Sequence, residues 1–438
     1  MLIDFRLSNY RSFREEQVLD LRAGGAKDRS HEESLIRHGR FELVRAAMVS
    51  GSNASGKSNL LRGIRFMVDF ITSSATKMTV GDRIPDVAPF LLDRDSRSRP
   101  STFEVTFLLG ETQYRYGFAV TAERVHEEWL VAIPSSTNRQ QRWLERTFDP
   151  KTEKTTWAFR GPLRRHERVL KDRTRDNGLV LSRGAEQNIE ELSKAFLWFR
   201  DSLWPLDLSY PPRGLAGKTA AWIKEKPELR KQVVSLLRHA DMGIEDLKIT
   251  DHPLDIEEMP ESIRSLYSER GLAEFRKDLV KAIMIRSIHR DETGRNSAEF
   301  DFDDESNGTQ RFFALVGPFL DALGKGAVVV VDELGCSMHP LLTRKLIELF
   351  QSPEANPRGA QLVFATHDVT LMDPELLRRD QIWLVEKNQA GASEMFSLYD
   401  FDTKDRPRNT EAFQRNYLAG RYGGVPRFGP VFEDLEIP

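Results

Sequence analysis

The segment from Gly51 to Ser58, GSNASGKS, constrains the fold of this chain more than any other. It matches G-x-x-x-x-G-K-[ST] at every fixed position, between a strand-like run at 43–49 and a helical run at 59–71. This context predicts a phosphate-binding loop, in which Lys57 reaches the β- and γ-phosphates and Ser58 ligates Mg²⁺. The residues predicted to bind the nucleotide are Gly51, Ser52, Asn53, Ala54, Ser55, Gly56, Lys57, Ser58 and Asn59. The predicted cofactors are therefore ATP and Mg²⁺.

Two adjacent carboxylates, Asp332 and Glu333, end an apolar run at 327–331. Such a run is typical of a central parallel strand buried on both faces. Paired carboxylates there are costly unless they are used. Beside a phosphate loop, we predict that Asp332 holds the Mg²⁺ through water and that Glu333 polarises the attacking water. The simpler alternative is an acidic cap at the end of the strand.

The hexapeptide ESNGTQ, residues 305–310, opens a helical pattern that continues to Ala322. Ser306 is a natural N-cap, and Gly308 would let the backbone approach an anion closely. By itself the hexapeptide is a weak signal, because an N-cap serine is ordinary.

The spacing of these motifs is informative. Lys57 and Asp332 are too far apart in sequence for one uninterrupted nucleotide-binding core, whereas Ser306, Asp332 and His367 follow one another closely. This order resembles the ATP-binding-cassette (ABC) ATPases of the SMC and DNA-repair branch. The resemblance implies that Ser306 and Gly308 complete the ATP site of a second subunit, within a homodimer or a higher even oligomer. The match is imperfect, since Glu305 and Asn307 depart from the usual L-S-G-G-Q signature.

Three further positions take roles from this resemblance. His367, after the strand-like run 362–365, matches a switch histidine that contacts the γ-phosphate; the alternative is a structural histidine. Arg11, within NYRSF at 9–13, matches an arginine near the nucleotide. His339-Pro340 matches a subunit-coupling loop, or is a simple turn. The predicted catalytic residues are thus Lys57, Glu333 and His367, and the predicted metal ligands are Ser58 and Asp332.

The bulk properties exclude several classes of protein. The net charge is −3, so there is no global basic field for nucleic acid. The single cysteine, Cys336, excludes an intrachain disulfide, and no run approaches the length of a membrane span. Without an apolar signal core at the N-terminus, we expect a cytoplasmic protein with no membrane partner. A local basic run could contact nucleic acid or an acidic partner, or be a solvated face: Arg164, Arg165, Arg168, Lys171, Arg173 and Arg175.

The predicted fold is α/β, a phosphate-loop NTPase of ABC/SMC-head type with an antiparallel first-lobe sheet. We predict an N-lobe at 1–132 and a mainly helical insertion at 133–299, with helices at 189–203, 219–238 and 263–284. A C-lobe at 300–400 and a tail at 401–438, packed on the core, complete the chain. No heptad pattern persists, so long coiled-coil arms are not expected.

A narrower resemblance is to OLD-related ATPases, especially subunits of AbiL/Rlo-type abortive-infection loci. Matching segments include ESNGTQRFFAL, VVVVDELGCSMHP and YLAGRYGGVP. It implies Mg²⁺-dependent ATP hydrolysis by an ATP-sandwiched dimer that controls a separate effector in anti-phage defence, with a nuclease encoded nearby as one candidate. We expect no nuclease domain in this chain. The alternatives are a DNA-binding SMC-like repair or recombination ATPase and a slow ATP switch that acts as a timer.

Overall fold

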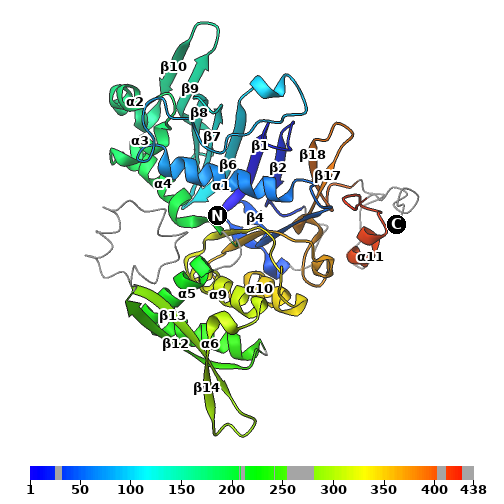
Figure 1. The fold of residues 1–438 in the computed structure, drawn as a ribbon. Helices are drawn as coiled ribbons and strands as arrows, with labels where there is room; N and C mark the ends of the chain where they lie inside the picture. Colours follow the sequence, from blue (N-terminus) through cyan, green and yellow to red (C-terminus); the bar gives the residue numbers. More distant parts are fainter. Residues whose placement is uncertain are drawn as a thin grey trace, which may run out of the picture. The chain divides into compact units, whose positions relative to one another are not determined.

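The computed structural model describes residues 1–24, 32–206, 208, 213–240, 242–253, 281–401 and 411–426 (Figure 1). The chain divides into two compact units. The first holds residues 1–206, 322–335 and 343–438, and the second holds residues 207–321 and 336–342. Each unit is described by itself.

The first unit contains a seven-stranded antiparallel sheet of strand order β10-β9-β8-β7-β6-β1-β2. In β6, Phe103, Val105 and Phe107 are buried on one face while Glu104 and Thr106 alternate with them, the period expected of a strand. The strands are β1 Leu2–Ser8, β2 Gln17–Asp20, β6 Ser101–Leu109, β7 Thr112–Val120, β8 Val125–Pro134, β9 Gln141–Asp149 and β10 Lys154–Phe159.

A second sheet of the first unit has the strand order β11-β15-β16-β5-β17-β18, and its first five strands are parallel. The strands are β5 Ala46–Gly51, β11 Leu203–Leu206, β15 Val328–Val331, β16 Gln361–Ala365, β17 Ile382–Lys387 and the antiparallel β18 Ser393–Ser397. All residues of β5, β15 and β16 are buried, as expected for strands covered on both faces. Because β16 lies between β5 and β15, the carboxyl ends of these three strands meet at one edge.

Helix α1, Lys57–Ser73, lies between the two sheets of this unit (Figure 1). It contacts β1 of the antiparallel sheet and β5, β11 and β16 of the parallel sheet. Its apolar side chains, including Phe66 and Phe70, join the core with α3 Val180–Glu186 and α4 Glu190–Ser202. The other strands and α-helices described in this unit are β3 Ile36–His38, β4 Phe41–Leu43, α2 Glu167–Arg173, most of α10 Pro340–Gln351 and α11 Phe413–Leu418.

The second unit combines helices with a three-stranded antiparallel sheet of order β12-β13-β14. Its elements are α5 Arg213–Glu225, α6 Pro227–His239, β12 Ile244–Pro253, β13 Lys281–Arg290, β14 Ser297–Asp301 and most of α9 Asn307–Lys325. Helix α6 packs on β12, and α5 packs on α6 and β13.

The predicted fold class, α/β with an antiparallel sheet in the first lobe, is confirmed. The predicted helix at 189–203 corresponds to α4, and that at 219–238 is divided at Pro227 into α5 and α6. The third, 263–284, lies outside the described residues except for 281–284, which begin β13.

The sheet extends further than the predicted N-lobe boundary. Residues 133–134 still belong to β8, and β9 and β10 continue the same sheet, so 141–159 are strands rather than part of a helical insertion. The alternation in β9 is concealed because Arg146, a charged residue, occupies an inward position beside Leu144. In the part of the chain that the structure describes, no helix is long and apolar enough to cross a membrane.

Candidate nucleotide-binding site

The predicted phosphate loop connects the buried strand β5 to the start of α1. Gly51 has φ 152° and Gly56 has φ 123°, values that L side chains rarely adopt. A Cβ at Gly51 would lie 2.2 Å from the Val385 carbonyl oxygen, and one at Gly56 would lie 2.4 Å from Ser393 Oγ. Only glycine fits these two positions, so the glycine spacing of the motif follows from the path of the loop.

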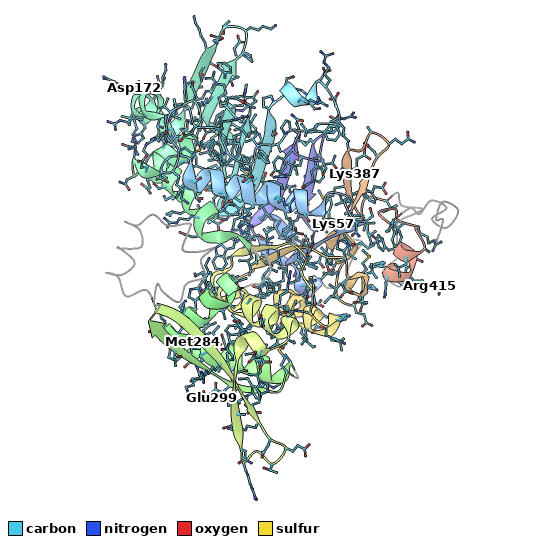
Figure 2. All side chains as sticks on the ribbon, in the orientation of Figure 1. Lys57, Asp172, Met284, Glu299, Lys387 and Arg415 are labelled. Atoms are coloured by element: carbon cyan, nitrogen blue, oxygen red, sulfur yellow. The ribbon has the colours of Figure 1, made fainter. Side chains whose placement is uncertain are left out.

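Lys57 is the first residue of α1 and is labelled in Figure 2. Its side chain is buried, and its amine donates to the carbonyl oxygens of Gly51 and Ser52, each at 2.9 Å. Ser58 and Asn59 follow it in the first turn of the helix, where backbone N–H groups have no partner within the helix. The loop residues Asn53 and Ala54 are exposed. The arrangement offers N–H donors and one ammonium group to an anion.

Asp332 and Glu333 follow β15, and His367 follows β16 by two residues. The chain segments after these strands are held together, because Thr366 Oγ1 donates to the Leu334 carbonyl at 2.8 Å and Leu334 N donates to the Ala365 carbonyl at 2.9 Å. The carboxylates and the histidine therefore lie at the same edge of the sheet as the loop that leaves β5.

Electrostatic effects show that these side chains are close enough to interact. Burial lowers the pKa of the Lys57 amine, while the charges of Asp332 and Glu333 act to raise it. Partial desolvation lowers the pKa of His367, and the charge of Lys57 lowers it further against the two carboxylates. The structure thus brings Lys57 together with Asp332, Glu333 and His367, which lie far from it in the sequence.

Glu333 has φ 55°, a left-handed conformation that is strained for any residue with a Cβ. Such strain persists where the surrounding structure enforces it, and it is common at functional sites. The side chain of Glu333 is exposed to solvent.

The residues present fit a bound Mg²⁺–nucleotide. Asp332 Oδ1 is buried and has no hydrogen-bond partner among the described residues. A carboxylate and a serine hydroxyl, Ser58, are the kind of oxygen ligands that Mg²⁺ takes together with substrate phosphates and water. Across the described ranges, no cluster of three or more His, Cys, Asp or Glu side chains is arranged to hold a metal independently of phosphate.

Two serines that the sequence did not single out also position the loop. Ser393 of β18 donates its hydroxyl to the Ser55 carbonyl, and its backbone N–H donates to the Ser12 carbonyl at 2.7 Å. Asn59 Nδ2 donates to Ser12 Oγ at 2.9 Å. Ser12 belongs to the NYRSF motif, so that motif contacts the phosphate loop through its serine.

The neighbouring Arg11 has local partners. Its Nε donates to the Tyr10 hydroxyl at 3.1 Å, and its guanidinium lies 5.5 Å from the centre of the Tyr10 ring. Tyr10 in turn stacks on Phe66 of α1. A contact between Arg11 and the nucleotide remains a prediction.

In the second unit, the predicted signature forms the start of α9. Ser306 Oγ accepts from Thr309 N at 3.1 Å, which is an N-cap. A Cβ at Gly308 would lie 2.6 Å from the Ser337 carbonyl oxygen, so this glycine is required by a neighbouring backbone group. The departure at Glu305 also has a reason, since its carboxylate accepts from Ser287 Oγ and lies 2.7 Å from His289 Nε2 of β13.

His339 lies just before α10, where its Nδ1 accepts from Leu341 N at 3.2 Å and Pro340 is the first helical residue. This contact accounts for His339-Pro340 as a helix start.

The residues of the basic run at 164–175 have different environments in the structure. Arg175 donates to the Ser74 and Ala75 carbonyls at the end of α1, so its role is structural. The others are exposed on the 3₁₀ turn Gly161–His166 and on α2, the helix that carries Asp172 in Figure 2: Arg164, Arg165, Arg168, Lys171 and Arg173.

Comparisons with known proteins give one family. A family profile described as "AAA domain, putative AbiEii toxin, Type IV TA system" matches residues 47–373, more than half of the chain. The matched range contains every predicted site residue except Arg11. Among solved structures, "Crystal structure of the SmcHead bound to the C-winged helix domain of ScpA" matches at 14% identity and a TM-score of 0.41, covering 90% of this chain and 97% of that one. No curated protein matches.

Proposed function

We propose that this chain is an ABC/SMC-type ATPase that controls a separate effector. The chain belongs to the family described as "AAA domain, putative AbiEii toxin, Type IV TA system", and it is therefore an ATPase. The observation that carries this proposal is the convergence of Lys57, Asp332, Glu333 and His367 at one sheet edge. In the proposed site, Lys57 binds phosphate, Asp332 binds the metal, Glu333 orients the attacking water and His367 contacts the γ-phosphate.

Each side chain has a distinct part in the reaction that we propose. The loop N–H groups and Lys57 would bind and orient the phosphates, and Ser58 and Asp332 would hold Mg²⁺, whose charge would stabilise the negative charge of the transferred group. Glu333 would orient the attacking water, and His367, two residues after β16, would contact the γ-phosphate. Catalysis of phosphoryl transfer consists largely of such positioning and electrostatic stabilisation.

We further propose that the enzyme acts as a homodimer or higher even oligomer, with two ATP molecules held between the phosphate loop of one subunit and Ser306 and Gly308 of the other. The capped start of α9 supports this role, because a helix N-terminus carries partial positive charge and N–H donors. Binding and hydrolysis would then couple to opening and closing of the dimer.

The biological role that we propose is anti-phage defence of the abortive-infection type, with a separate partner protein as effector. It is supported by the toxin wording of the family description and by the likeness of YLAGRYGGVP and VVVVDELGCSMHP to OLD-related proteins of the AbiL/Rlo type. A nuclease encoded nearby is the first partner to test.

A DNA-binding repair or recombination ATPase is the second candidate. The exposed cations of α2 and the preceding turn favour it, since Lys and Arg side chains neutralise phosphates and give salt-dependent binding.

Steady-state phosphate release tests the ATPase proposal, with Mg²⁺ and with Mg²⁺ removed by a chelator. We expect turnover that requires the metal and that is lost in Lys57→Ala. Turnover that persists after chelation and in Lys57→Ala would show that this site is not the site of hydrolysis. Co-purification with neighbouring gene products, followed by plasmid cleavage and DNA binding by each protein separately, distinguishes the two roles.

A further inference from the structure

The described part of the C-terminal tail, 411–426, lies against the strands that carry the phosphate loop. Tyr417 of α11 is 4% exposed, and its hydroxyl donates to the Gly424 carbonyl at 2.9 Å. The tail residue Tyr417 is therefore bonded to the turn that follows its own helix. Burial raises the pKa of the Tyr417 hydroxyl, and Ser50, just before Gly51 in β5, acts to lower it, which places the two side chains near each other.

The turn after α11 makes the second contact. Gly424 N donates to Glu386 Oε2 of β17 at 2.9 Å. A Cβ at Gly423 would lie 2.8 Å from the same oxygen, and one at Gly424 would lie 3.9 Å from the Cα of Gly51. Gly423 and Gly424 have φ 75° and 69°, which glycine adopts readily, and the turn that they form contacts β17 and the first residue of the loop.

Gly51 therefore has two close neighbours. A Cβ on Gly51 would come within 2.2 Å of the Val385 carbonyl oxygen, and a Cβ on Gly424 would lie 3.9 Å from the Cα of Gly51. Gly51 is also the residue whose carbonyl accepts from the Lys57 amine. A displacement of Gly51 would therefore displace the group that would bind phosphate.

We infer that Tyr417, Gly423 and Gly424 form a tail clasp that positions the phosphate loop for its nucleotide. The inference rests on the proposed ATPase function. Tyr417 is a positioning residue, since it acts through Gly424 on Gly51. The tail is then a part of the nucleotide site, as Ser12 and Ser393 are at the opposite end of the loop.

The test compares Tyr417→Phe with Tyr422→Phe. The first variant removes only the hydroxyl that holds the clasp. The second removes a hydroxyl of the same tail that bonds to Asn416 and Glu411, away from the loop. We expect Tyr417→Phe to raise KM for ATP by about three- to tenfold, the equivalent of one net hydrogen bond, with little change in kcat. Tyr422→Phe should leave both constants unchanged.

Amide hydrogen exchange gives a measurement that needs no turnover. Without nucleotide, residues 50–58 should exchange faster in Tyr417→Phe than in wild type or Tyr422→Phe, while the melting temperatures of the variants stay similar. Glu386→Ala should reproduce the effect, and Glu386→Gln, which keeps an acceptor oxygen, should restore most of the loop's protection.

Unchanged exchange at 50–58 in Tyr417→Phe would overturn the clasp, as would equal effects of the two tyrosine variants. The two proposals fail separately. A wild-type protein without Mg²⁺-dependent turnover contradicts the ATPase function, whereas an active wild type with an unchanged KM in Tyr417→Phe contradicts only the clasp.

Discussion

The amine of Lys57 lies 2.9 Å from the carbonyl oxygen of Gly51, six residues earlier in the same loop. A buried ammonium requires acceptors, and in this conformation the loop supplies them from its own backbone. Exchange of these carbonyls for phosphate oxygens would keep the charge satisfied. Two carbonyl groups of the loop, those of Gly51 and Ser52, thus point toward this one amine.

Lys57→Ala should lower the rate of ATP hydrolysis by about 10²–10³-fold, because it removes a positive charge that faces the developing phosphate charge. Phosphate release under saturating MgATP measures this. The matched control is Lys345→Ala, an exposed lysine of α10 that pairs with Glu348. Activity of Lys57→Ala within twofold of wild type would remove the phosphate-loop assignment.

Glu333→Gln should bind ATP but hydrolyse it slowly, and it should accumulate as a closed dimer. The amide keeps the shape of the side chain and loses the carboxylate that orients water. Light scattering after size exclusion, with and without ATP, measures the dimer, and Glu375→Gln, an exposed glutamate, is the control. Normal turnover in Glu333→Gln would show that another group orients the water, and His367 would be the next residue to test.

The sequence predicted those parts of the candidate site in which local backbone geometry limits the residue type. The glycines at 51 and 56 and the buried strand before Asp332 are such cases, because few residues satisfy their conformation and burial. It did not predict Ser393, whose contact with the loop spans 338 residues of chain. Nor did it predict Glu386 or Tyr417, which are linked to the loop through Gly424 of the tail. Such contacts depend on how distant elements pack, and no local pattern encodes them.

Gly308 shows a different limit. We predicted that this glycine would let an anion approach the backbone, and the structure shows that the Ser337 carbonyl approaches it. Both explanations require a missing Cβ, so the residue type alone could not distinguish them. Similarly, Arg146 in β9 concealed a strand, because its partner Glu128 is on another strand.

His367 should be mostly neutral at pH 7. Partial desolvation and the charge of Lys57 lower its pKa from the ordinary 6.5, so protonation favours the unfolded chain. Its contribution to stability is present above pH 6.5 and is lost as the pH falls toward the lower folded pKa. NMR titration of the imidazole should give a midpoint below 6.5, higher in Lys57→Ala and unchanged in Lys345→Ala. A midpoint that is the same in Lys57→Ala and in wild type would show that the charge of Lys57 does not act on His367.

Arg146→Met should lower the free energy of unfolding by about 3–5 kcal/mol, because it leaves the buried carboxylate of Glu128 without its cation. The two side chains are fully buried, 3.7 Å apart, and Glu128 also accepts from Val180 N and Leu181 N at the start of α3. Chemical denaturation measures the loss. Arg142→Met, at an exposed arginine of the same strand, should cost at most about 1 kcal/mol. Equal losses in the two variants would show that the buried ion pair contributes no more to the free energy of unfolding than the exposed one.

Ser306→Arg should block hydrolysis while each subunit still binds ATP, because we propose that Ser306 acts on the nucleotide of its partner. The substitution also removes the cap on Thr309 N, which costs about 1 kcal/mol of stability. Ser306→Asn, which keeps a capping side chain without the bulk, is therefore the control, and it should retain binding and much of the turnover.

Mixing Ser306→Arg with Lys57→Ala gives the decisive measurement. If subunits exchange at random, half of the dimers are mixed, and each of these has one intact composite site. The mixture should then recover about one quarter of the wild-type rate, although each variant alone is inactive. Loss of nucleotide binding by Ser306→Arg subunits, or a mixture as inactive as its components, would show that the site is not shared between two subunits.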